Sequence, residues 1–280
     1  MNDHSQLLLV GAGRLGGALL AGWTRSGSVT AERLMIRDPA PGALAREAEA
    51  AGARLNPADL DLGAAGAVVL AVKPQGWRAA ADALAPVLAE DAVVISVMAG
   101  VRMEALAAAF PGRPVARVMP TTAVEIAQGV AALHAPDDRA LATALELFSP
   151  IATVVKLDDE ALMDAAVGVS GSAPAYLYAF TEALAAAGEQ AGLPAESASA
   201  LARATMESAA ALMAASPNVS PAELRAAVTS PRGTTEAALD VLLQPEALPL
   251  LLRHAVAAAA ARSRALAGDG AAATSAGAGG

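Results

Sequence analysis

Cysteine is absent from the 280 residues, and lysine occurs only at positions 73 and 156. A chain without cysteine forms no disulfide and offers no thiolate nucleophile or thiolate metal ligand. Aromatic residues make up only 2% of the chain, whereas the hydrophobic fraction is 55%. That fraction is mostly alanine, leucine and valine, which suffices for buried cores and favours close-packed helices. We expect a globular protein, and the lack of cysteine is compatible with the reducing cytoplasm as its location.

Basic residues are also scarce. The chain has 19 lysines and arginines against 28 aspartates and glutamates, and its isoelectric point is near 4.8. Such an acidic surface repels nucleic acid and anionic membranes. No apolar run reaches the roughly 18 residues of a spanning helix, and the first residues lack the basic segment and cleavage site of an export signal. We therefore expect no nucleic-acid partner and no membrane association.

Short apolar runs alternate with helical patterns in the first half of the chain. Helices are expected at residues 14–26 and 41–51. Strands are expected at residues 6–10, 33–37, 67–72, 92–97, 114–118 and 152–157. This alternation predicts an α/β fold, a doubly wound parallel sheet of the Rossmann type with helices on both faces. We assign residues 1–157 to this dinucleotide-binding domain.

Strand patterns stop after residue 156, and alanine-rich helical segments continue to about residue 268. The segment from Thr181 to Gly192 is apolar on more than one face, which predicts that it is buried, either by its own domain or by a partner in a dimer, the alternative that we favour. We assign residues 158–268 to an all-helical domain for substrate binding and dimerisation. Residues 269–280 are rich in glycine, alanine and serine and are expected to be a disordered tail.

The first expected strand leads directly into a Gly-x-Gly-x-x-Gly motif that opens the first helix. In that position the motif predicts a dinucleotide site. Gly11 would permit the tight turn, Gly13 would let a pyrophosphate approach the backbone, and Gly16 would let the helix pack closely. The alternative is a glycine turn that serves packing alone.

Two charged residues end the second expected strand, about 20 residues beyond the glycine motif. Asp38 is suited to bind the ribose hydroxyls of NAD, whereas Arg37 could meet the 2′-phosphate of NADP. Asp38 could instead serve only to form the turn in "RDPAPG". Lys73, after the strand at 67–72, could contact the dinucleotide or extend into solvent. The sequence thus predicts NADH or NADPH as cofactor without deciding between them.

The expected helical domain contains no lysine. Hydroxy-acid dehydrogenases that pair a Rossmann domain with a helical domain use a helical lysine as acid and base, so that chemistry is not expected here. The histidines, His4, His134 and His254, have no common spacing and are expected to be structural or exposed. We expect no metal site.

The stretch "SPRGTTEAALDVLL", residues 230–243, places hydroxyl side chains ahead of an apolar helical pattern. Such residues often cap the helix by accepting hydrogen bonds from its free N–H groups. The same N–H groups and the helix dipole could instead bind a ligand carboxylate or phosphate. Both interpretations remain open on this stretch alone.

Five segments together carry a specific resemblance: "GAGRLGGAL", "AVKPQ", "RVMPTTAVEIAQGV", "DEALMDAAVGVSGSAPAYLYAF" and "SPRGTTEAALDVLL". They closely resemble the pyrroline-5-carboxylate reductase family, over nearly the whole chain. The family reduces the cyclic imine of 1-pyrroline-5-carboxylate to proline, the last step of proline synthesis, with hydride from NADPH or NADH. Its members dimerise through their helical domains and often form decamers, so the resemblance implies a homodimer and allows a decamer.

The resemblance also implies which residues form the site. The turn would bind the substrate carboxylate through Ser230, Gly233, Thr234 and Thr235, with Thr235 nearest the imine nitrogen as the catalytic residue. Ser170 and Ser172 would face the nicotinamide. With the motif residues, the cofactor positions are Gly11, Gly13, Arg14, Leu15, Gly16, Arg37, Asp38, Asn56, Ala71, Val72, Lys73, Pro74, Ser170 and Ser172.

The chain departs from the usual family pattern around this expected pocket. The departures are Thr121, Thr122 and Ala123 for Asn-Thr-Pro, Ala173 and Arg232 for glycines, Asn218 for a glutamate, and Asp38 and Pro39 for an Asn-Arg pair. They leave two alternatives: a reductase of another cyclic imine, or a dinucleotide sensor without catalysis.

Overall fold

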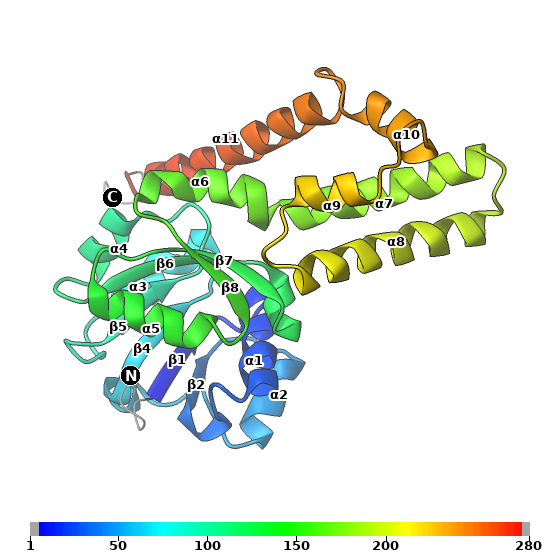
Figure 1. Ribbon diagram of the computed structural model, residues 1–280. Helices are drawn as coiled ribbons and strands as arrows, with labels where there is room; N and C mark the ends of the chain where they lie inside the picture. Colours follow the sequence, from blue (N-terminus) through cyan, green and yellow to red (C-terminus); the bar gives the residue numbers. More distant parts are fainter. Residues whose placement is uncertain (1–5, 276–280) are drawn as a thin grey trace. The chain divides into compact units, whose positions relative to one another are not determined.

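The computed structural model describes residues 6–275, and the surroundings of side chains up to residue 266. The chain forms two compact units (Figure 1). The sheet unit combines the chain up to Gly171 with the chain from Ala259, and the helical unit is Ser172–Ala258. The division thus lies later than the expected boundary at residue 157, because the segment after it still packs on the sheet. Met163 shares a buried cluster with Met119 and Ala132.

Within the described residues, the sheet unit is built on one sheet with the strand order β3-β2-β1-β4-β5-β6-β7-β8 (Figure 1). The strands are β1 (Gln6–Val10), β2 (Leu34–Arg37), β3 (Arg54–Leu55), β4 (Ala65–Leu70), β5 (Val93–Ser96), β6 (Val115–Pro120), β7 (Gly129–His134) and β8 (Ala152–Lys156). Neighbouring strands are parallel except β6 and β7, which are antiparallel.

The antiparallel pair differs from the expected all-parallel sheet. Strands β6 and β7 are joined by a short connection that contains the 3₁₀ helix η4 (Thr122–Ile126). A parallel neighbour requires a crossover of a dozen or more residues, so this short connection returns the chain in the opposite direction.

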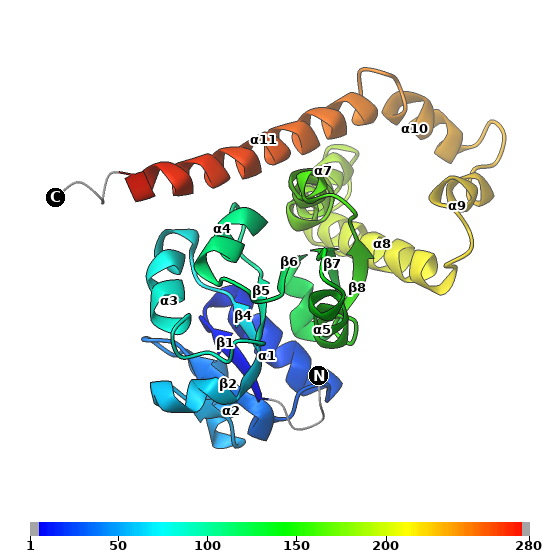
Figure 2. The same cartoon turned by 90° about the vertical axis from the view of Figure 1, so that its left-hand side faces the viewer.

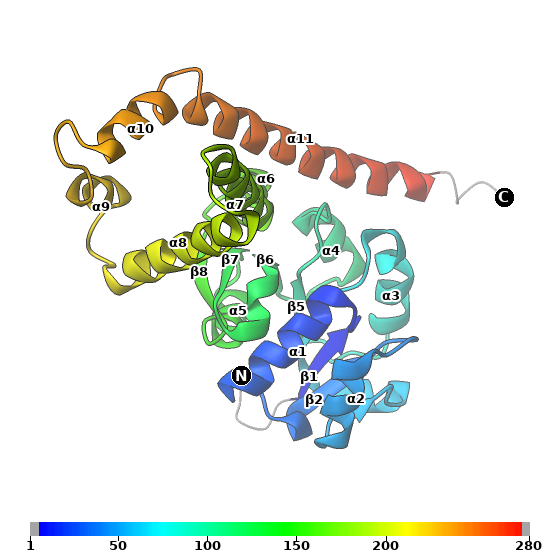
Figure 3. The same cartoon turned by 90° about the vertical axis from the view of Figure 1, so that its right-hand side faces the viewer.

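Helices cover both faces of the sheet, as a doubly wound fold requires. Successive residues of a strand point to opposite faces. In β1, Leu7 and Leu9 pack with α1 (Arg14–Ser26), α2 (Ala43–Ala50) and α5 (Asp138–Phe148). Leu8 and Val10 pack on the other side, with α3 (Trp77–Leu84) and α4 (Met103–Ala109). Figure 3 shows α1 and α2 beside β1 and β2.

The sheet unit ends in α6 (Met163–Ala166) and a π-helical turn, η6 (Val167–Gly171). The helical unit follows, with α7 (Ala173–Gln190), α8 (Ala195–Ala215), α9 (Pro221–Ala227) and α10 (Thr234–Leu242). Helices α7 and α8 form a hairpin and lie side by side (Figures 1 and 2). No helix in the described part of the chain combines the length and apolarity needed to cross a bilayer.

The last helix, α11 (Leu248–Ser275), extends further than the sequence indicates. The expected tail is helical from residue 269 to Ser275, which corrects that part of the prediction. Alanine has the highest helix propensity of any residue type, so the run of alanines at residues 271–273 favours this helical extension, whereas the two glycines before it oppose it. Residues 276–280 lie outside the described residues.

Candidate functional site

A cavity of about 570 Å³ opens at the carboxyl ends of β1, β2 and β4. We call it the strand-end cavity. In the sheet order, β2 and β4 lie on either side of β1, so the direction of strand succession reverses here. Open α/β sheets bind ligands at this kind of switch point. Its lining consists of Val10, Gly11, Gly13, Arg37, Asp38, Pro39, Ala40, Ala71, Val72, Lys73, Gly76, Ala80, Ala83 and Leu84.

The three motif glycines have three different surroundings. Gly11 has a φ of +90°, a conformation that glycine adopts without strain, and its N–H donates to the Arg37 carbonyl at 2.9 Å. A Cβ on Gly16 would lie 2.0 Å from the Gly11 carbonyl oxygen, whereas a Cβ on Gly13 would meet nothing within 4 Å. Turn formation and close packing therefore explain Gly11 and Gly16, but packing does not explain Gly13.

Asp38 is buried, and both of its carboxylate oxygens accept backbone hydrogen bonds. Oδ2 accepts from the Ala12 N–H at 2.6 Å, and Oδ1 accepts from the Ala40 N–H at 2.7 Å. The hydrogen bond from Ala40 shows the turn-forming role considered from the sequence. The hydrogen bond from Ala12 also ties Asp38 to the glycine loop. The carboxylate fixes the end of β2 against the loop that follows β1.

Asn56, just after β3, holds the backbone of Asp38. The Asp38 N–H donates to Asn56 Oδ1 at 2.9 Å, and Asn56 Nδ2 donates to the Asp38 carbonyl at 2.9 Å. Asn56 itself has a φ of +48°, in the left-handed region that asparagine tolerates better than most residues. Asn56, an expected cofactor position, is not among the residues that line the cavity. It contacts Asp38, which is one of them.

Arg37 forms an ion pair that the sequence did not predict. Its Nη2 lies 2.6 Å from Oδ1 of Asp59, in the 3₁₀ helix η2 (Asp59–Ala64). Its Nη1 is buried and has no hydrogen-bond partner among the described residues. Nothing local in the sequence marks Asp59, because the pair joins segments that only the sheet brings together.

The remaining cofactor positions lie at three places. Arg14 and Leu15 begin α1, and Pro74 begins the 3₁₀ helix η3 (Pro74–Gly76) that follows Lys73. Ser170 lies in the π-helical turn η6, where its hydroxyl donates to the Ala166 carbonyl at 2.8 Å, and Ser172 precedes α7. Single π-helical turns occur frequently at functional sites.

The expected substrate residues meet at one turn of the helical unit. The Gly233 N–H donates to the Ser230 carbonyl at 3.0 Å, and Arg232 between them has a φ of +60°. With Pro231 before it, this is the pattern of a type II turn, which favours glycine at the position of Arg232. That preference explains why the family usually has glycine there.

Helix α10 begins at Thr234 with Gly233 as its N-cap, and no side chain caps its first turn. The hydroxyl-capping interpretation of this stretch is therefore wrong. A Cβ on Gly233 would lie 2.4 Å from Ser230 Oγ and 3.0 Å from the Ser230 carbonyl oxygen, so the Ser230 hydroxyl would have to rotate away. A helix start whose N–H groups lack a side-chain cap is suited to bind an anion.

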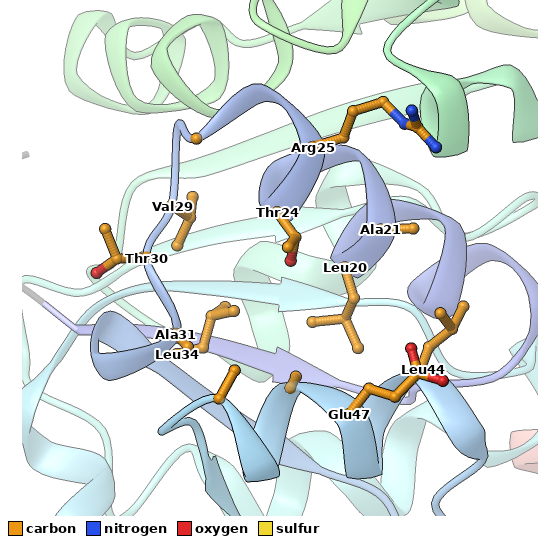
Figure 4. Close-up of a pocket in the computed structure, with 13 residues that line it drawn as sticks. Leu20, Ala21, Thr24, Arg25, Val29, Thr30, Ala31, Leu34, Leu44 and Glu47 are labelled. Atoms are coloured by element: carbon orange, nitrogen blue, oxygen red, sulfur yellow. The ribbon is translucent and has the colours of Figure 1, made fainter.

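A second cavity, of about 550 Å³, lies between α1, α2 and the loop before β2 (Figure 4). Its walls are mainly apolar, with Leu20, Val29, Leu34 and Leu44 among them. Arg25 extends away from it in Figure 4, and its Nε–H donates to the Glu125 carbonyl at 3.4 Å. This cavity brings no set of convergent polar groups together.

Two of the three histidines fall within the described residues, one in each unit. His134 bonds through Nδ1 to the Leu157 carbonyl at 2.9 Å, His254 is exposed, and His4 lies outside the described residues. Among the residues that the structure describes, no group of three or more His, Cys, Asp or Glu side chains could hold a metal ion.

Residues 160–266 match the family model "Pyrroline-5-carboxylate reductase dimerisation", so the chain contains a dimerisation domain. Residues 6–100 match the model "NADP oxidoreductase coenzyme F420-dependent". A solved pyrroline-5-carboxylate reductase from Coxiella burnetii is 29% identical, with a TM-score of 0.85 over 94% of this chain and 99% of the other. One from Plasmodium falciparum, with NADP bound, has the same fold at 22% identity, with a TM-score of 0.79 over 95% and 99%.

Full-length relatives are closer in sequence. The pyrroline-5-carboxylate reductase of Pisum sativum is 34% identical, over 95% of this chain and 97% of its own length. That of Pseudomonas aeruginosa is 39% identical, over 94% of this chain and 97% of its own length. These matches confirm the resemblance drawn from the sequence motifs: the chain belongs to the pyrroline-5-carboxylate reductase family.

Proposed function

We propose that this chain reduces 1-pyrroline-5-carboxylate to proline with hydride from NADPH, or from NADH. The observation that carries the proposal is the near full-length identity of 39% to the Pseudomonas aeruginosa pyrroline-5-carboxylate reductase. The match of residues 6–100 to an NADP oxidoreductase model supports the choice of coenzyme. The location in the cytoplasm remains a prediction.

The strand-end cavity is proposed to bind the coenzyme. Its residues fit such a group, because the open side of Gly13 leaves room for a pyrophosphate beside the backbone. The buried Nη1 of Arg37 is an unused donor at the end of β2, the strand end that contacts the adenosine ribose in this type of fold. Gly11, Gly16, Asp38 and Asn56 would hold the loops in position, and the nicotinamide, when bound, would supply the hydride.

The turn before α10 is proposed to bind the substrate carboxylate. The uncapped N–H groups of the first turn and the hydroxyls of Ser230 and Thr234 are suitable donors. Each hydrogen bond to a charged group contributes about 1.5 to 3 kcal/mol. In the reduction, the carbon of the N-protonated imine accepts a hydride, and the nitrogen keeps its proton and becomes an amine. Thr235 would orient that nitrogen or relay a proton to it from water, so its role is positioning and not strong acidity.

We also propose a homodimer formed through the helical unit. Among residues 172–258, all of which the structure describes, only Ala198 and Ala202 are buried. Large apolar side chains are exposed instead, including Leu177, Leu201 and Leu251. A monomer rarely exposes so much apolar surface without a partner. A decamer built from such dimers remains a prediction from the resemblance.

Steady-state assays test the reaction directly. Purified protein is expected to consume 1-pyrroline-5-carboxylate with NADPH or NADH, and less readily a six-membered imine carboxylate. A preference for the six-membered imine would favour the alternative of another imine reductase. Coenzyme binding without turnover of either imine would favour the sensor.

The Thr235→Ala variant tests the residue assignment. We expect kcat/KM to fall about 10- to 100-fold, the equivalent of about one lost hydrogen bond to a charged group. Thr205→Ala is the matched control, since Thr205 is exposed on α8 and is expected to keep its activity. Unchanged kcat/KM in Thr235→Ala would show that the assignment of this residue is wrong.

A further inference from the structure

The pairing of Arg37 in the strand-end cavity is one-sided. Its Nη2 bonds to Oδ1 of Asp59 at 2.6 Å, while its Nη1 is buried without a partner. A guanidinium binds a carboxylate or a phosphate best through two nitrogens at once. The observed pair therefore engages Nη2 and leaves Nη1 of this guanidinium without an acceptor.

The two carboxylates near Arg37 differ in their freedom to move. Both oxygens of the neighbouring Asp38 are fixed by the N–H groups of Ala12 and Ala40. Asp59 lies on a 3₁₀ helix, and its side chain is 59% exposed, against 34% for that of Arg37. Asp59 is therefore the carboxylate that an incoming anion can displace.

The end of β2 is the place where Rossmann-type folds distinguish the two coenzymes. NADPH carries a phosphate on the 2′-oxygen of its adenosine ribose, and NADH carries a hydroxyl. A phosphate monoester has a charge of about −1.5 to −2 and three acceptor oxygens, so it is a stronger partner for Arg37 than a single carboxylate oxygen. To bind Arg37 through both Nη1 and Nη2, it has to displace Asp59 from Nη2.

We propose that Asp59 sets the coenzyme selectivity by competing with the 2′-phosphate of NADPH for the Arg37 guanidinium. NADH binding leaves the ion pair intact, whereas NADPH binding breaks it. Asp59 thus lowers the preference for NADPH that Arg37 would otherwise produce. The inference rests on the proposed function only in requiring that the cavity binds a dinucleotide.

Direct binding titrations of the full chain test this without any imine. NADPH and NADH are titrated separately, and their fluorescence reports binding. In Asp59→Asn we expect NADPH to bind about fivefold more tightly, the upper range for an exposed ion pair. NADH affinity is expected to change by less than about twofold, because its ribose hydroxyl brings no charge to Arg37. Asp59→Ala, which removes the acceptor entirely, is expected to give the same shift.

Two further variants separate competition from a general charge effect. Asp61→Asn removes the same charge from the same 3₁₀ helix, where Asp61 is exposed, and is expected to leave both affinities unchanged. In an Arg37→Gln background, Asp59→Asn is expected to have little effect on NADPH, since the two side chains act as a pair.

Three results would overturn the proposal. These are an equal shift for both coenzymes, no shift in either Asp59 variant, or a shift that persists without Arg37. Failure of the unmodified chain to bind either coenzyme would overturn the proposed function as well. Coenzyme binding with the expected selectivity shift but no turnover of the imine would support the role of Asp59 while contradicting the proposed substrate.

Discussion

The sheet unit and the helical unit differ in how far their apolar side chains are buried. In β1, Leu7, Leu8 and Leu9 have no solvent exposure, because helices cover both faces of the sheet. In α7, no residue is buried, although the helix is rich in alanine and leucine. The first unit therefore contains its own hydrophobic core. The second has an apolar surface that a second copy of the chain is proposed to cover.

This difference bears on what stabilises each unit. Burial of apolar surface contributes about 25 cal/mol per Å², and the strands obtain this within one chain. Most helical stability in proteins comes from packing of the apolar face, which α7 and α8 obtain mainly from each other within the helical unit described here. If the proposed dimer forms, we expect the stability of the helical unit to depend on protein concentration, as it does in obligate dimers.

The largest expected effect comes from a charge on the exposed face of α7. Leu177, 53% exposed, is changed to Asp, which would bury an unpaired carboxylate in the proposed interface. We expect association to weaken by about 3 to 5 kcal/mol, measured by sedimentation velocity. Leu60→Asp in the sheet unit is the control, because Leu60 is 93% exposed and lies outside the proposed interface. A Leu177→Asp protein that remains fully dimeric at low concentration would contradict this use of the helical unit.

In the sheet unit, the substitution Gly16→Ala is expected to destabilise the fold through a steric conflict. In Gly16→Ala the new Cβ would lie 2.0 Å from the Gly11 carbonyl oxygen, so the glycine loop has to move. We expect the free energy of unfolding to fall by about 3 kcal/mol, measured by chemical denaturation, with loss of coenzyme binding.

Gly13→Ala is the paired variant, since its Cβ meets nothing within 4 Å. It is expected to keep the free energy of unfolding and to weaken coenzyme binding alone. Equal stability losses in the two variants would show that both glycines serve packing.

Removing the Asp38 carboxylate has a smaller expected effect on the same unit. In Asp38→Ala the N–H groups of Ala12 and Ala40 lose their acceptor. We expect the free energy of unfolding to fall by about 2 kcal/mol, measured by urea denaturation. Asp82→Ala, at an exposed position of α3, is the control and should change stability little. An unchanged Asp38→Ala protein would mean that water replaces the carboxylate.

The smallest expected effect lies in the helical unit, at the capping box of α9. The Ser220 hydroxyl accepts from the Glu223 N–H, and the Glu223 carboxylate accepts from the Ser220 N–H. Ser220→Ala is expected to lower the free energy of unfolding by about 1 kcal/mol at neutral pH, measured by thermal unfolding.

This loss is expected to depend on pH. The hydrogen bond from the Ser220 side chain, and to a smaller extent the one from its backbone, lowers the pKa of Glu223 below its ordinary value of 4.5. A lowered pKa in the folded state means that the contribution is present above pH 4.5 and is lost as the pH falls through the folded-state pKa. The difference between Ser220→Ala and the unmodified chain should therefore shrink in acid. A difference that stays constant with pH would exclude a contribution from the Glu223 carboxylate.

Local patterns predicted much of the sheet unit. Helix α1 occupies residues 14–26 as expected, because the glycine motif starts it and Gly27, with a φ of +68°, ends it. Strand β7 was missed, because its sequence "GVAALH" has only one β-branched residue. Its direction depends on pairing with β6, a non-local contact.

At the candidate site, the glycine loop and the turn at residues 230–233 could be predicted from the sequence, because their residue types have local conformational causes. The family could be identified from the resemblance of short motifs. The tertiary structure alone decided that Asp38 is tied to Ala12, that Arg37 pairs with Asp59, and that α10 starts without a hydroxyl cap. Such contacts join strand ends that are far apart along the chain, or depend on where a side chain points. Neither can be derived from residue spacing.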